Sequence, residues 1–148
     1  MASTVGTIKT AIKTLLDATG DFGSVYTDCR ERIEKPSPAS VMMFHDAGSQ
    51  EIGTYDKFYR TSTLIFYLFV PRLATNGDAE MQQQMDESLE DLLGVFVNDP
   101  TLSGTVHTSF AESWDISTVT EPSPTVPGAS IVTRMLAEVR VAVRYEVT

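Results

Sequence analysis

Apolar residues recur at spacings of three and four in two stretches of the chain, the pattern of an amphipathic helix. The two apolar stripes are Val5, Ile8, Ile12, Leu15 and Leu16, and then Met81, Met85, Leu89, Leu92, Leu93 and Phe96. Ser3 and Thr4 can cap the first stretch, and Asn98-Asp99-Pro100 ends the second. The pattern predicts helices over residues 4–18 and 79–97 that bury these stripes, methionines included, in a core.

Five other segments are rich in β-branched and aromatic residues or alternate apolar with polar ones, which favours strands. They are residues 24–33, 39–44, 61–70, 106–116 and 136–147. The third is apolar on both faces, so we expect it to be central or covered on both sides. The last alternates apolar with charged residues, which predicts one face in water. Trp114 is expected to lie in the core or at a subunit interface.

Two segments lack a strand pattern. Residues 46–59 are mostly polar and contain two glycines, which predicts a long hairpin connection or a protruding arm. Residues 117–130 contain three prolines and Gly128, which predicts a long exposed loop. The order α-β-β-β-α-β-β predicts a single α+β domain over residues 1–148. We expect a mixed, mostly antiparallel sheet with two helices packed on one face, and a second face that meets water or another subunit.

The chain of 148 residues carries 20 acidic and 11 basic residues and a net charge of −9. This balance disfavours tight nucleic-acid binding through a basic face, because phosphates are repelled. The acidic residues Asp86, Glu87, Glu90 and Asp91 all fall on the polar face of the second helix. They are interpreted first as a solvated face, and alternatively as an acidic wall that faces the lumen of an assembly.

No constellation of catalytic residues is recognisable in the sequence. His45 and His107 are far apart and lack a metal-binding spacing, and Cys29 is expected to be a packed or half-buried thiol. The sequence therefore predicts no enzyme, no metal and no cofactor. A single cysteine allows no intrachain disulfide, no signal peptide is visible, and the longest apolar run, residues 64–70, is too short to span a bilayer. We expect a protein made in the cytoplasm, without a membrane partner.

Several short segments, taken in order, carry a family resemblance. Pro38-Ala39-Ser40-Val41 leads into a strand, the apolar run 64–70 follows a polar hairpin, and Asp99-Pro-Thr-Leu-Ser-Gly104 follows the second helix and leads to a closing strand over residues 134–145. In this order the chain resembles the tail terminator (tail completion) proteins of long-tailed bacteriophages. The resemblance covers most of the chain, and the segment 99–104 is its most specific part.

The resemblance implies a virion subunit at the tail–neck junction, assembled in the host cytoplasm. It implies a homo-oligomer, a hexameric ring that caps the tail tube, stops its polymerisation and provides the head-joining surface. The implied partners are the tail tube protein and a head–tail connector or head-closure protein, and DNA passes through without specific binding. The interface would lie on the 46–59 arm and the 117–130 loop, with Tyr55, Phe58, Tyr59, Pro122 and Pro124 in contact with partners.

Three alternatives are kept. The chain can be a different neck or tail subunit, such as a head-closure or tube protein; a tube protein polymerises without limit, whereas a terminator stops at a closed ring. It can be a small α+β enzyme that uses Cys29 or His107. It can also be an acidic adaptor that binds a basic partner.

Overall fold

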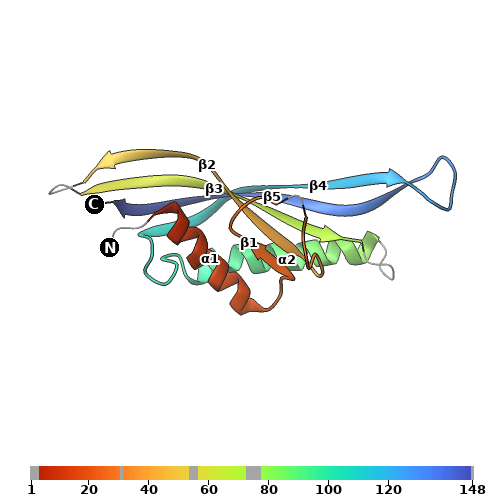
Figure 1. The fold of residues 1–148 in the computed structure, drawn as a ribbon, viewed down its shortest axis with the longest axis horizontal. Helices are drawn as coiled ribbons and strands as arrows, with labels where there is room; N and C mark the ends of the chain where they lie inside the picture. Colours follow the sequence, from red (N-terminus) through yellow and green to blue (C-terminus); the bar gives the residue numbers. More distant parts are fainter. Residues whose placement is uncertain (1–3, 31, 54–56, 73–77, 148) are drawn as a thin grey trace.

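The computed structural model describes residues 4–30, 32–53, 57–72 and 78–147. Two helices and five strands follow one another in the order α-β-β-β-α-β-β, which confirms the predicted α+β class (Figure 1). They are α1 (Val5–Thr19), β1 (Ser24–Tyr26), β2 (Ser40–Ile52), β3 (Phe58–Pro71), α2 (Asp78–Asn98), β4 (Thr108–Pro122) and β5 (Ser130–Val147).

The five strands form one sheet in the order β1-β2-β3-β5-β4. The short β1 runs parallel to β2, and the other neighbours are antiparallel, so the sheet is mixed and mostly antiparallel as predicted. The apolar strand β3 lies at the centre, between β2 and β5. Its even-numbered side chains from Leu64 to Val70 are buried beneath the helices, and Ile65 is buried on the other face.

Both helices pack on the same face of the sheet (Figure 1). Thr4 caps α1 by accepting a hydrogen bond from the backbone N–H of Thr7, and Gly20, at a φ of 73°, ends it. The predicted stripes of the two helices are buried except for Val5, Leu15 and Leu93, which are partly buried. The ring of Phe96 on α2 packs edge-on against Phe66 on β3 at 5.6 Å between centroids. The helices and the helix-facing side of the sheet therefore share one core.

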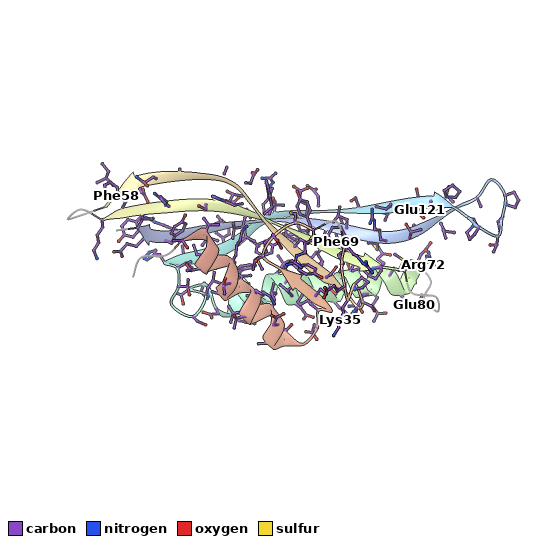
Figure 2. The ribbon with its side chains drawn as sticks, viewed as in Figure 1. Lys35, Phe58, Phe69, Arg72, Glu80 and Glu121 are labelled. Carbon is purple, nitrogen blue, oxygen red and sulfur yellow. The ribbon has the colours of Figure 1, made fainter. Side chains whose placement is uncertain are left out.

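Two hairpins extend beyond the helices at opposite ends of the molecule (Figure 1). In Figure 2, Phe58 marks the β2–β3 end and Glu121 the β4–β5 end. We call residues 44–52 and 58–63 the β2–β3 arm. In β2 the first four residues are buried and the following nine are exposed, so the β2 half of the arm lies outside the core.

The strand predictions were wrong in their lengths. Residues 46–52 continue β2, and Phe58 and Tyr59 begin β3, so the 46–59 segment is mostly paired strand. Residues 117–122 belong to β4 and Ser130 begins β5, so the predicted 117–130 loop shrinks to residues 123–129. Backbone pairing with the neighbouring strand holds these polar residues extended, even though they bury little apolar surface.

The first predicted strand shows the opposite error. Only Ser24–Tyr26 of the segment 24–33 is a strand. Gly23 lies against the 35–37 backbone so closely that a Cβ would stand 2.3 Å from the carbonyl oxygens of Lys35 and Ser37. This contact fixes the start of β1, and after Tyr26 the chain returns to the start of β2 without further strand pairing. Among the described residues, no helix is both long and apolar enough to cross a membrane.

Candidate assembly interface

Strand β4 is a long and exposed sheet edge. It has 15 residues, pairs only with β5 among the described residues, and is exposed at every position from Glu112 to Thr118. Its register is irregular at Ala111/Ser113 and again at Val119/Thr120, so the stretch between these points is regular strand. A regular edge strand with free N–H and C=O groups is a template for pairing with another chain.

The other candidate edge is the distal half of β2. Strand β1 covers only Ser40–Met42, so residues 44–52 pair with β3 alone in the part of the chain that the structure describes. Two exposed large apolar side chains lie here, Phe44 at 45% and Ile52 at 80% exposure. The sheet thus ends in a free edge on each side.

A groove runs along the β4 edge because the helix layer is too narrow for the sheet. Trp114 and Ile116 lie opposite Val139 and Ala137, which are fully buried under the helices, so all four belong to the helix-facing side. Trp114 and Ile116 nevertheless remain 48% and 44% exposed. The space between β4 and α2 is a groove of about 420 Å³, which we call the α2–β4 groove. Its lining is Glu90, Leu93, Phe96, Val97, Phe110, Ala111 and Trp114.

The groove has an acidic rim. Helix α2 carries six acidic residues and no basic one. Of the four acids predicted to face solvent, Asp86, Glu87 and Glu90 are exposed as expected, and Glu90 lines the groove. The prediction was wrong for Asp91, which is half-buried. Desolvation, a side-chain hydrogen bond with Asp21 and the nearby charges of Asp21 and Glu87 raise the pKa of Asp91 above its usual range.

The opposite, open face of the sheet is charged. Arg140 on β5 bridges Asp46 at 3.1 Å and Glu138 at 3.6 Å, and Arg144 pairs with Glu51 at 2.5 Å. Such exposed ion pairs add little to the stability of the fold, and their charged groups remain solvated. The apolar surface available for assembly is therefore concentrated at the two edges and the groove.

Four of the five predicted interface residues lie at the two opposite ends of the sheet. Tyr55 lies outside the described residues. Phe58 and Tyr59 are half-buried in β3, and the ring of Tyr59 is already engaged by His107 at 6.1 Å and by the Arg144 guanidinium at 4.9 Å. Pro122 ends β4 and Pro124 lies in the following turn, and both are exposed. The structure does not bring the two groups together within one subunit.

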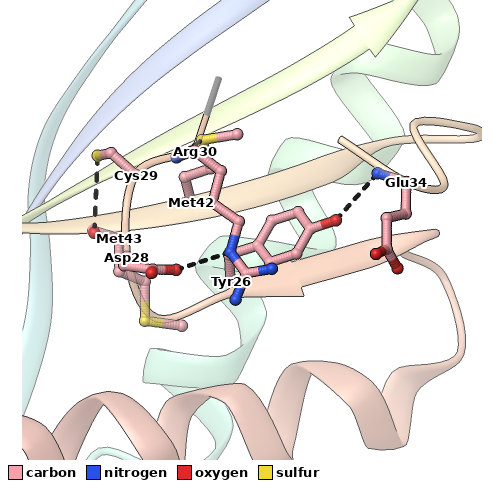
Figure 3. Close-up of polar contacts among 7 residues, drawn as sticks. All are labelled: Tyr26, Asp28, Cys29, Arg30, Glu34, Met42 and Met43. Carbon is pink, nitrogen blue, oxygen red and sulfur yellow. Dashed lines mark hydrogen bonds and ion pairs between the residues drawn. The ribbon is translucent and has the colours of Figure 1, made fainter. Parts of the chain in front are cut away.

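The residues considered for catalysis do not form one site. Cys29 follows β1 and is exposed, so the expectation of a packed thiol was wrong; its Sγ lies 3.9 Å from the carbonyl oxygen of Met43 (Figure 3). Beside it, Arg30 pairs with Asp28 and lies over the ring of Tyr26. His45, exposed within β2, lines a shallow cavity with Ser62 and Tyr145, whereas His107 contacts Tyr59.

No group of three histidine, cysteine, aspartate or glutamate residues in the described ranges is placed to hold a metal ion.

The sequence did not predict that the apolar residues Ile52, Val97 and Ile116 would be exposed. A signal was present for Ile116, which follows Trp114 at the strand spacing of two. The sequence did not indicate which strand would form an edge of the sheet.

No protein-family model matches the chain, and neither does any curated protein. Its function must therefore be inferred from its own surfaces.

Proposed function

We propose that this chain is a structural subunit that assembles into a closed ring through the two free edges of its sheet. By its resemblance to tail terminator proteins, the ring caps the tail tube of a long-tailed phage, stops tube polymerisation and provides the surface that joins the head. The subunit then acts at the tail–neck junction of the virion.

The observation that carries this proposal is the pair of exposed edges, distal β2 on one side and β4 on the other. Three successive antiparallel pairings separate β2 from β4, so the two edges run in opposite directions. The next copy can therefore add its β2 to β4 without being flipped, and the antiparallel pattern continues. A contact between two different surfaces of identical subunits generates a ring or an open helix.

A two-fold dimer is the other arrangement available to an exposed edge, with β4 of one copy against β4 of another. Such a pairing uses only one of the two edges and leaves distal β2 uncovered. The ring covers both, which is why we favour it. The net charge of −9 suits a channel for DNA, because phosphates and carboxylates repel each other.

The proposal is tested by imaging and weighing the purified protein, alone and with tail tubes of the same virus. We expect rings of one size, free or on tube tips, and tubes that stop growing when the protein is added. Unlimited tubes made of this chain alone would assign it instead to the tube proteins. Absence of rings both in solution and on tube tips would refute the ring.

A further inference from the structure

We propose that the α2–β4 groove of each subunit receives the β2–β3 arm of a second copy, with Ile52 seated among the apolar groove residues and Arg60 facing Glu90. This inference rests on the proposed ring, and names the two surfaces that would hold it together.

The groove needs an apolar occupant. Val97, Phe110 and Trp114 line it, and their exposed fractions are 78%, 57% and 48%. Surface of this kind, gathered in one place beside an unpaired strand edge, is typical of a protein interface. Its shape, a trough between a helix and a strand, suits the side chains of an added strand.

The described chain offers two other exposed apolar sites that could fill the groove in a second copy. One is the arm, with Ile52 at 80% exposure, and the other is the β4–β5 turn, with Val126 at 55% exposure. Within one subunit β5 separates the arm from β4, so the arm belongs to the edge opposite the groove. A second copy must therefore supply it.

Charge distinguishes the arm from the turn. The groove carries Glu90, Asp86 precedes it by four residues on α2, and Glu112 is exposed on β4 next to the groove residue Ala111. Residues 123–129 of the turn carry no charge. On its helix side the arm carries Arg60, which is exposed, donates from Nε to Gln50 at 2.8 Å and forms no ion pair among those of the described residues. The two acidic residues of the arm, Asp46 and Glu51, are paired with Arg140 and Arg144 on the open face. The acidic rim therefore favours the arm.

The arm presents the required residues on the correct face. Arg60 is two residues before Ser62 and four before Leu64, both of which face the helix side of β3, and Ile52 lies opposite Phe58 on that same side. Trp114 and Ile116 face the helix side of β4. When β2 of one copy continues the sheet of the next, these faces become continuous. Within one subunit Ile52 is level with Val147 and Trp114 with Val139, so the contact requires the two copies to be staggered by eight residues (147 − 139) along the strands.

A charge-swap experiment tests the contact. Glu90→Arg and Arg60→Glu should each weaken self-association about tenfold or more, and the double variant should recover most of that loss, because the pair is restored with reversed signs. Self-association is measured by sedimentation velocity, or by retention on tube tips if the free protein remains single. Asp86→Arg, on the same helix but outside the groove lining, serves as the control and should have a smaller effect.

Cross-linking locates the occupant independently of affinity. In a Cys29→Ser background, Ile52→Cys protein is mixed with Trp114→Cys protein under oxidised glutathione, and we expect a disulfide between the two variants. A bond between two Trp114→Cys chains, or between Val126→Cys and Trp114→Cys in place of the arm, would overturn the inference. Circular dichroism of each variant confirms that the fold is retained.

The outcomes separate this inference from the ring itself. Rings that persist in Arg60→Glu and give no arm–groove disulfide would leave the ring standing and refute the contact. An arm–groove disulfide in open filaments would support the contact and refute the terminator function.

Discussion

Replacing Ile52 by serine should weaken assembly while leaving the folded subunit almost unchanged. Ile52 stands at the end of β2 and is 80% exposed in the single subunit, so it adds little to the core. Full burial of an isoleucine side chain is worth about 1.5–3 kcal/mol. Burial of the exposed four-fifths in the α2–β4 groove would therefore contribute about 2 kcal/mol per contact, or about a 30-fold change in its dissociation constant.

The assay is a concentration series of the purified protein, weighed by mass photometry, with thermal unfolding recorded on the same samples. We expect Ile52→Ser to need about 30-fold more protein for the same degree of assembly, at an unfolding temperature close to that of the parent protein. Val126→Ser is the matched control, because Val126 is also an exposed apolar residue but lies in the β4–β5 turn. Equal assembly of Ile52→Ser and the parent protein, or an equal loss in Val126→Ser, would refute the reasoning.

Three further changes probe the fold and its charges. Phe66→Ala removes a fully buried ring that packs on Phe96, and should cost about 3–5 kcal/mol in denaturant unfolding; a loss below about 1 kcal/mol would contradict the assigned core. Tyr145→Phe deletes the hydrogen bond to the buried Ser62 hydroxyl, 3.1 Å away, and should cost about 1–2 kcal/mol in the same measurement, whereas an unchanged midpoint would show that the pair contributes nothing. Asp91→Asn should stabilise the protein at neutral pH, because the raised pKa of Asp91 means that its charged form is disfavoured in the folded state. That gain should fade as the pH falls below the ordinary carboxyl range, where Asp91 is protonated in both states, and a gain independent of pH would assign the effect to packing.

The helices and the central strand could be predicted because the spacing of their apolar residues follows from which side chains are buried. Ile8, Ile12 and Leu16 repeat at helical spacing since they face the core, and the observed bounds of both helices differ from the prediction by one residue at each end. Strand β3 is apolar on both faces, because Leu64, Phe66 and Leu68 are buried under the helices and Ile65 is buried on the other face. In each case a local pattern and the tertiary environment agree.

The projecting parts could not be predicted because they bury little. Residues 46–52 of β2 and 117–122 of β4 lack an apolar period, and pairing with β3 or β5 holds them extended. Pro122 suggested a loop, yet a proline is tolerated at the end of an edge strand. The exposure of Trp114 could not be predicted either, since the same residue would be buried if a third helix covered β4. An edge position is a property of the whole sheet.

Cys29 and Asp91 illustrate the same limit. Cysteine is usually buried, but the chain leaves β1 at Tyr26 and carries Cys29 to the surface. Asp91 belongs to the polar stripe of α2 in sequence, and only the arrangement of the segment after α1 places Asp21 beside it. Contacts between distant segments decide both cases.

Electron microscopy of the purified protein with tail tubes tests the central claim most directly. The account predicts closed rings of uniform diameter, built from copies joined edge to edge and seated at tube ends. Single copies that never associate with one another or with a tube end would contradict it.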